Sequence, residues 1–229
     1  MDWRSFWDGD HAIYVSETHR HVHYQAIADG ILDHVATLAA PAQSVVLDYA
    51  CGEALEAHRV AAAVGKLVLC DGAPSVVAKL NERHVGVAVV PEDLDRVLGD
   101  GEADLIVVSS LIQYLTLADF EALVDRLSMK LKAGGRLVIA DVIPPDAGLV
   151  ADVTSLLRNG IRHGYFYAGL VGLVATAVSP YRKLRQSLGL TTYSQADMIS
   201  LLTAHGLTAH RHEPNLGLTP HRMTFVATR

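Results

Sequence analysis

Short apolar stretches alternate with helix-like stretches through the middle of this 229-residue chain. The strand-like stretches are 45–47, 67–69, 85–90, 104–108 and 136–142, and the helix-like ones are 54–64, 74–82 and 118–131. Strands that alternate with helices run parallel, so the pattern predicts a parallel sheet with helices on both faces. Of all the sequence features, this alternation restricts the fold most, and it predicts an α/β class.

The segments on either side of this alternation have a different character. Residues 1–40 are expected to form an N-terminal cap, with an irregular arm followed by a helix from about 16 to 38. Residues 146–193 have helical composition and are expected to form a lid-like insertion. Ser194 begins a capping box for a helix to about 205, and 207–213 and 223–228 are expected to pair antiparallel. We expect one domain over residues 1–229.

Composition restricts the function. The chain has 19 Lys and Arg against 25 Asp and Glu, a net charge of −6, which disfavours nonspecific nucleic-acid binding. Two cysteines, Cys51 and Cys70, are too few for a disulfide framework, so we expect a reducing, cytoplasmic setting. No apolar stretch typical of a signal peptide follows Met1, and the apolar run at about 165–178 is too short to span a bilayer.

The segment Val45–Ala54 is the most informative for chemistry. It reads as a buried strand, an acid at Asp48, and a loop of small residues that opens a helix. Small residues let a ligand approach the backbone, and a helix N-terminus offers free N–H groups. Asp71 follows the second strand, where an acid can accept hydrogen bonds from ribose hydroxyls. These features predict a nucleoside cofactor at the carboxyl ends of the strands.

Five motifs in order resemble the class I S-adenosylmethionine-dependent methyltransferases, specifically the small-molecule type. They are Asp48–Ala54, Leu69–Pro74, Pro91–Leu94, Ala103–Ser110 with Leu111 and Tyr114, and Leu131–Ile139. The resemblance covers about 44–143 and 222–227. It implies a doubly wound, Rossmann-like sheet of seven strands in the order 3-2-1-4-5-7-6, mostly parallel with an antiparallel last strand. It also implies S-adenosylmethionine as cofactor.

The same resemblance assigns the cofactor-binding residues. They are Asp48, Tyr49, Ala50, Cys51, Gly52, Asp71, Gly72, Glu92, Asp93, Leu94, Ser109, Ser110 and Tyr114. In this assignment Ala50 and Gly52 lie along the methionine part and Asp71 binds the ribose. Asp93 and Leu94 flank the adenine, and Ser109–Leu111 lie under the sulfonium.

The first motif departs from the family pattern of an acid, any residue, then Gly-x-Gly-x-Gly. Only Gly52 is retained, and Ala50 and Ala54 replace the outer two glycines. Alanine tolerates a positive φ poorly, so the departure concerns cofactor affinity more than fold. It also leaves open a regulatory protein that binds the cofactor without catalysis. A nicotinamide dehydrogenase is disfavoured because Gly-x-Gly-x-x-Gly does not follow the first strand.

Simpler structural roles stay open for the same residues. Asp48 can orient its own loop, Asp71 can be the acid at a helix start, and Glu92 with Asp93 can be a solvated first helical turn. Ser109 and Ser110 can be ordinary strand-end residues. Cys51 is expected to be a small packed residue and not a nucleophile.

Methyl transfer from a sulfonium is an in-line displacement, and a hydroxyl or thiol acceptor must also lose a proton to a base. The base candidates are Tyr14 and His23 in the N-terminal segment and His163 in the lid. We expect one of Tyr14, Arg20, His23 and Tyr24 to reach the pocket. Too few ligands of one kind lie together for a metal site, so no metal is expected.

The lid is expected to determine the acceptor. Residues 168–178 are almost wholly apolar, and Arg158, Arg162, Arg182, Lys183 and Arg185 surround them. Such a segment can cover a hydrophobic or anionic substrate, rest on a membrane surface, or pack as a helical hairpin on the domain or a second subunit. The fourth strand lacks the Asn/Asp-Pro-Pro-aromatic signature of nucleic-acid amino methylation. We therefore expect a small, apolar acceptor and no nucleic acid. A lipid-directed enzyme at a membrane surface is the alternative, and a monomer and a homodimer both remain open.

Overall fold

The computed structural model describes residues 14–177 and 190–229. The predicted arm before residue 14 lies outside the described residues. So do three of the basic residues near the lid, Arg182, Lys183 and Arg185.

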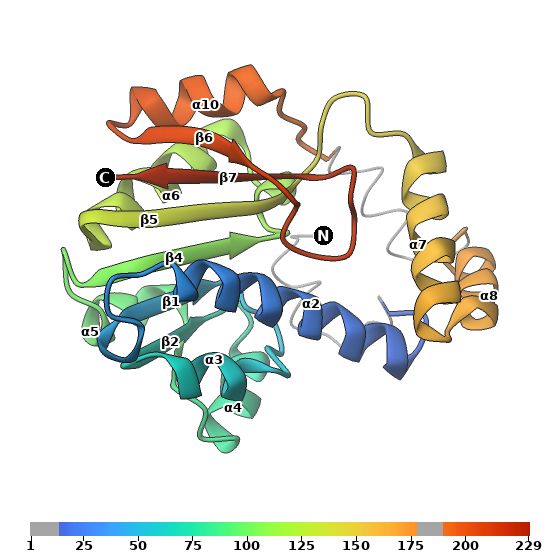
Figure 1. Cartoon of the computed structure of the whole chain (residues 1–229), viewed down its shortest axis with the longest axis horizontal. Coiled ribbons are helices and arrows are strands. Elements are labelled where there is room, and N and C mark those ends of the chain that lie inside the picture. The colour runs from blue at the N-terminus through green and yellow to red at the C-terminus, as the bar shows by residue number, and fades with distance from the viewer. Residues whose placement is uncertain (1–13, 178–189) are drawn as a thin grey trace.

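Seven strands form one sheet in the order β3-β2-β1-β4-β5-β7-β6 (Figure 1). They are β1 (Val45–Tyr49), β2 (Lys66–Cys70), β3 (Val87–Val89), β4 (Ala103–Ser109), β5 (Leu131–Val142), β6 (Thr208–His212) and β7 (Met223–Thr228). The first five run parallel, and β7 is antiparallel to both β5 and β6. The predicted fold class and strand order are confirmed.

Helices cover both faces of the sheet, as the apolar strands require. On one face the core contains side chains of α2 (Glu17–Ala36), α3 (Ala57–Ala63) and α4 (Pro74–Glu82). On the other it contains side chains of α5 (Leu94–Val97), α6 (Leu117–Lys130) and α10 (Gln195–Ala204). Alternate residues of β1 point to the two cores: Val46 joins the first and Leu47 the second. Short 3-10 turns, η1 (Pro41–Gln43), η2 (Pro91–Asp93) and η3 (Ile112–Tyr114), complete the connections.

Most element boundaries follow their sequence signals. Helix α4 begins at Pro74 and ends at Glu82, as predicted, and the Ser194 hydroxyl accepts the Asp197 N–H at 3.1 Å to cap α10. Two boundaries are wrong: β5 begins at residue 131 and not at 136, and α3 begins at residue 57 and not at 54. Ala54 has φ 39°, which a right-handed helix does not admit, so the loop before α3 is longer than expected.

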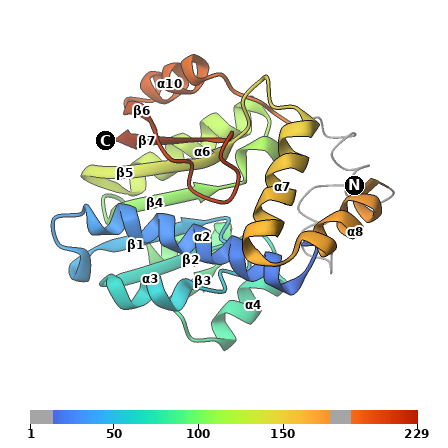
Figure 2. The same cartoon turned by 45° about the vertical axis from the view of Figure 1, so that its right-hand side comes forward.

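The lid region contains a helical hairpin, α7 (Leu149–His163) and α8 (Phe166–Ala177), which turns at Gly164 with φ 80°. Figure 1 shows the hairpin beyond the carboxyl end of β4, and Figure 2 brings it forward. Two contacts tie α7 to the β6–β7 loop: Asp152 lies 3.0 Å from Arg222 and 2.9 Å from His221. Within the described residues no helix is both long and apolar enough to cross a bilayer.

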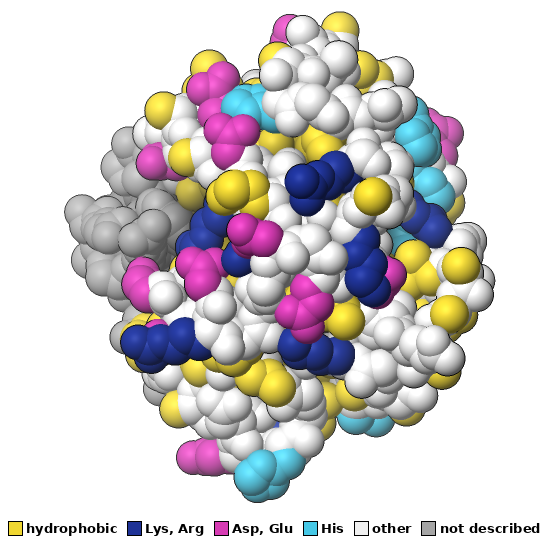
Figure 3. Space-filling view, turned by 90° about the vertical axis from the view of Figure 1, so that its left-hand side faces the viewer, with side chains coloured by type: hydrophobic (Ala, Val, Ile, Leu, Met, Phe, Trp, Pro, Cys, Tyr) yellow, Lys and Arg dark blue, Asp and Glu magenta, His cyan; other side chains and the backbone are white. Residues whose placement is uncertain are grey.

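The amino ends of the strands carry paired charges. Lys66 lies 2.6 Å from Glu102, and Lys130 lies 2.7 Å from Asp100. Figure 3, which looks at this side of the molecule, shows basic and acidic side chains interspersed. This face therefore offers no extended basic surface of the kind that binds a phosphate backbone.

Candidate cofactor site

The predicted cofactor residues come together where the parallel strands end, which we call the carboxyl edge. In the register of the sheet Tyr49 is the partner of Cys70 on β2 and of Val108 on β4. The loops that begin at Ala50, Asp71 and Ser110 therefore start side by side. In doubly wound sheets this edge is where ligands bind.

The β1–α3 loop (residues 50–56) has positive φ angles at three positions, a backbone conformation that glycine adopts without steric cost. Ala50 has φ 61°, Gly52 has φ 55° and Ala54 has φ 39°. These are the three positions where the family pattern has glycine, so the chain keeps the backbone conformation although it has lost two of the glycines. A left-handed conformation costs an alanine about 1–2 kcal/mol. Contacts from outside the loop must offset that cost.

The backbone N–H groups of the β1–α3 loop have acceptors on neighbouring elements. The N–H groups of Ala50 and Cys51 donate to the Cys70 carbonyl at 2.7 and 3.1 Å. The Gly52 N–H donates to Asp71 Oδ2 at 2.9 Å, and the Glu53 N–H donates to the Tyr24 hydroxyl at 3.0 Å. Strand β2 and helix α2 thus fix the first half of the loop.

Two arginines bind the second half of the β1–α3 loop. Arg20 on α2 forms an ion pair with Glu53, with 2.7 Å between Nε and Oε2. Arg83, at the C-terminal end of α4, donates to the carbonyl of Glu53 and to those of Ala54 and Leu55 at 2.8 and 3.2 Å. Arg83 belongs to no sequence motif, whereas Arg20 and Tyr24 were among the residues expected near the pocket.

Asp71 joins two loops at the carboxyl edge. Besides its contact with Gly52, its Oδ1 accepts the N–H of Ala73, the residue that precedes α4, at 2.9 Å. This is a local turn contact to the residue two positions on, and within the described residues no side chain caps the start of α4. Binding of a ribose by Asp71 stays a prediction.

The Asp48 carboxyl is buried below the loop, with 6% of the residue exposed. Burial, with a smaller contribution from the negative charge of Asp71, raises the pKa of Asp48 to about 7. Burial also raises the pKa of the Cys51 thiol, so this cysteine stays a neutral packed residue. Near neutral pH the Asp48 carboxyl is therefore only partly ionised, and the negative charge that favours a cationic ligand comes chiefly from Asp71.

The residues predicted to flank the adenine, Glu92, Asp93 and Leu94, do not form a closed binding site. Glu92 is exposed on η2, and Asp93 forms a 2.7 Å ion pair with the exposed Arg96. Leu94 is fully buried in the core. Glu92 and Asp93 thus have the surroundings of a solvated helical turn, and contact with a base stays a prediction. Gly72 is exposed beside Asp71.

Ser110, the residue that follows β4, contacts Asp141, an acid that was not among the predicted site residues. The Ser110 hydroxyl donates to Asp141 Oδ2 at 2.8 Å, and both residues have positive φ, 56° and 61°. Burial raises the pKa of Asp141, against the opposing effect of Arg222 3.9 Å away. Tyr114 lies nearby in sequence, on η3. Asp141 could have been found as a further acid near the end of a strand.

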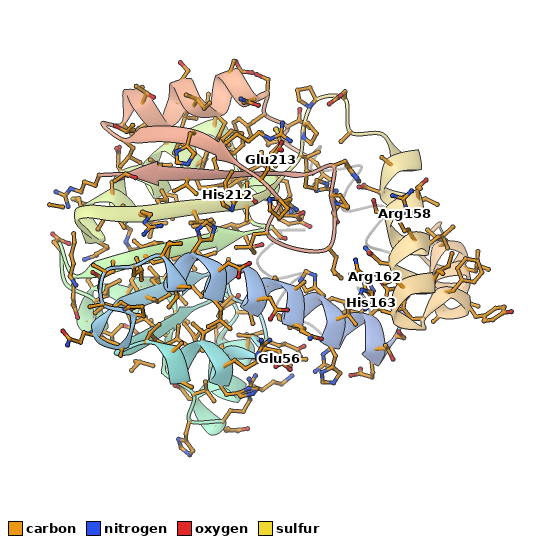
Figure 4. All side chains as sticks on the ribbon, in the orientation of Figure 1. Glu56, Arg158, Arg162, His163, His212 and Glu213 are labelled. Atoms are coloured by element: carbon orange, nitrogen blue, oxygen red, sulfur yellow. The ribbon has the colours of Figure 1, made fainter. Side chains whose placement is uncertain are left out.

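Two of the three base candidates lie together. The Tyr14 ring is 5.4 Å from the ring of His23 and 6.0 Å from that of Tyr24. Burial lowers the pKa of His23 to about 4 and raises that of Tyr14, so both are neutral at pH 7. His163 is the last residue of α7, near the end of the hairpin that approaches α2 (Figure 4).

An aromatic contact joins α2 to the hairpin. The imidazole of His19 stacks on the ring of Tyr165, between α7 and α8, at 4.9 Å. Val15 packs so closely on α8 that a Cβ added at Gly172 would lie 2.2 Å from its Cγ1. The carboxyl edge therefore has α2 and the hairpin joined beside it. The described residues contain no group of three His, Cys, Asp or Glu side chains that could hold a metal ion.

Comparisons with known proteins agree with this fold. A family profile described as "Methyltransferase domain" matches residues 46–135. Magnesium protoporphyrin IX methyltransferase from Synechocystis PCC 6803 with bound SAH is 15% identical, with a TM-score of 0.62 over 100% of this chain and 93% of that one. Geranyl diphosphate methyltransferase with GPP and sinefungin is 14% identical, with a TM-score of 0.57 over 90% and 77%.

A SAM-dependent methyltransferase from Aquifex aeolicus is 14% identical, with a TM-score of 0.54 over 94% of this chain and 97% of that one. No curated protein sequence matches the chain. At these identities the solved structures show a common fold.

Proposed function

We propose that the chain is a class I S-adenosylmethionine-dependent methyltransferase, as its fold and the methyltransferase profile over residues 46–135 indicate, and that it methylates a small, apolar acceptor. S-adenosylmethionine is its cofactor and supplies an electrophilic methyl group on a sulfonium. The residues of the carboxyl edge fit that cation. The β1–α3 loop with its positive φ values lies at this edge, and Asp71 supplies the negative charge that, besides burial, raises the pKa of the neighbouring Asp48.

One observation supports the proposal for the acceptor, the position of the hairpin of α7 and α8. The hairpin lies beside the carboxyl edge, and the stacking of His19 on Tyr165 joins it to α2. Aromatic and apolar side chains there would exclude water from the reacting atoms and hold an apolar acceptor by burial. In the same fold, two solved structures are of methyltransferases named for magnesium protoporphyrin IX and geranyl diphosphate.

The proton of a protic acceptor needs a base, and His23 is our first choice among His23, Tyr14 and His163. The His23 imidazole is neutral at pH 7 and can accept a proton, although its pKa of about 4 makes it a weak base; Tyr14 keeps its own proton because its pKa is raised. The Tyr14 hydroxyl is hydrogen-bonded to Tyr24. His163 is the alternative base from the hairpin side.

Two other functions follow from particular observations. The alanines at two glycine positions favour a regulatory protein that binds the cofactor without turnover. The exposed apolar side chains of Ile161, Tyr167 and Val171 on the hairpin favour a lipid acceptor at a membrane surface, since 71%, 83% and 70% of these residues are exposed. A second subunit could cover the same side chains.

Transfer of a labelled methyl group tests the proposal. The purified chain is incubated with methyl-labelled S-adenosylmethionine and a small-metabolite extract, with and without lipid vesicles. We expect label in solvent-extractable small molecules without vesicles, and none with the Asp71→Ala variant. Cofactor binding without transfer would indicate the regulatory protein. Label that appears only in vesicle lipid would indicate the membrane enzyme.

A further inference from the structure

The residues of the β1–α3 loop do not by themselves favour the backbone conformation that the loop adopts. Ala50 and Ala54 have φ of 61° and 39°, and alanine avoids this region. A free loop with these residues would spend most of its time in other conformations. Its N–H and C=O groups would then point away from the positions that a cofactor needs.

Arg83 supplies contacts on one side of the loop. Its guanidinium donates to three consecutive carbonyls, those of Glu53, Ala54 and Leu55. The Ala54 carbonyl is the middle one of the three, so these contacts hold the residue whose φ is 39° on both sides. A planar guanidinium suits this arrangement, because its N–H groups diverge at fixed angles and remain charged.

Tyr24 supplies the contact on the other side. Its hydroxyl accepts the Glu53 N–H at 3.0 Å, so both backbone groups of Glu53 are bound from outside the loop. The same hydroxyl would lie 2.8 Å from a Cβ at Gly52, which shows how closely the tyrosine covers the loop. Helices α2 and α4, which carry the two side chains, lie on either side of α3 (Figure 1).

We infer that Arg83 and Tyr24 are positioning residues that hold the β1–α3 loop in its cofactor-binding conformation in place of the two missing glycines. Neither residue needs to touch the cofactor. The inference rests on the proposed function only in that this loop binds the methyl donor. It makes one distinctive prediction: glycine at position 54 removes the need for the arginine.

Calorimetric titration with S-adenosylhomocysteine measures the effect. We expect Arg83→Ala to raise the Kd about tenfold or more, the loss that removing charge-assisted hydrogen bonds typically gives. Adding Ala54→Gly to Arg83→Ala should restore the Kd to within about threefold of wild type, because glycine adopts a positive φ without the steric cost. Ala54→Gly alone should change the Kd little.

The matched control is Arg136→Ala. Arg136 also donates to a backbone carbonyl and a side chain, those of Thr37 at 2.9 and 2.7 Å, but it lies within β5 beside Leu105 of β4, away from the carboxyl edge. It should leave the Kd unchanged. If Arg83→Ala does not fold, Tyr24→Phe removes the hydroxyl that accepts the Glu53 N–H and that is also hydrogen-bonded to Tyr14, and the same rescue by Ala54→Gly is expected.

Three results would overturn the inference. The first is that wild type and Arg83→Ala bind S-adenosylhomocysteine equally. The second is that Ala54→Gly fails to restore binding to Arg83→Ala or, where that variant does not fold, to Tyr24→Phe. The third is that wild type does not bind at millimolar ligand, which would also remove the proposed function. The first two would leave the proposed function intact.

Discussion

Replacing Asp48 by asparagine should stabilise the cofactor-free protein at alkaline pH and have a much smaller benefit in acid. The buried carboxyl has its pKa raised from 3.8 to about 7, chiefly by burial and further by the charge of Asp71. The folded chain therefore holds a proton that the unfolded chain releases near pH 4. Stability contributed by this group falls as the pH rises from about 4 to about 7 and then stays constant.

The size of this pH effect on stability follows from the two pKa values of Asp48, 3.8 in the unfolded chain and about 7 in the folded one. Each pH unit between them corresponds to about 1.4 kcal/mol, so an ionised Asp48 costs up to about 4 kcal/mol of folding free energy at pH 8. Asparagine has nearly the same shape and never ionises. The difference in unfolding free energy, Asp48→Asn minus wild type, should therefore increase by up to about 4 kcal/mol between pH 4 and pH 8.

Urea unfolding at a series of pH values measures this difference. Taking the difference between variant and wild type removes the effect of other groups, such as His23, whose lowered pKa acts on both proteins alike. Asp146→Asn, at an exposed carboxylate, is the control and should give a difference independent of pH. The reasoning is refuted if the Asp48→Asn difference is equally flat between pH 4 and pH 8.

Three further substitutions test other parts of the structure. Asp71→Ala removes the acceptor of two backbone N–H groups and should weaken S-adenosylhomocysteine binding by about 1.5–3 kcal/mol in calorimetry; unchanged affinity would remove Asp71 from the site. Gly52→Ala combines a φ of 55° with a Cβ only 2.8 Å from the Tyr24 hydroxyl, and should lower the unfolding free energy by about 1–2 kcal/mol in urea; equal stability would contradict the conformation of the loop. Ser194→Ala removes the cap of α10 and should cost about 1 kcal/mol in the same assay, whereas Ser194→Asp should cost little.

Several features of the site were predictable because the sequence carries them locally. An acid at the end of a strand, followed by small residues and a helix, identified the β1–α3 loop and Asp71. The predicted departure at Ala50 and Ala54 corresponds to two of the positive-φ positions in the chain. The roles of His23, Tyr14 and His163 remain predictions, since a base is defined by the substrate that it contacts.

The residues that hold the site in place were not predictable in the same way. Arg83 follows α4 and Asp141 ends β5, and neither belongs to a recognisable motif. Arg83 reaches the β1–α3 loop across 28 to 30 positions of sequence, and Ser110 reaches Asp141 across 31. Such contacts depend on which elements the sheet brings together.

The sequence by itself determined the class of fold, the order of the elements and the edge of the sheet at which we propose that the cofactor binds. These follow from apolar periodicity and turn residues, which act over a few positions of the chain. The tertiary structure alone decided how the two alanines tolerate a glycine conformation and which acids become buried together. Both depend on burial and on hydrogen bonds between distant segments, and these exist only once α2, α4 and β5 have packed on the sheet.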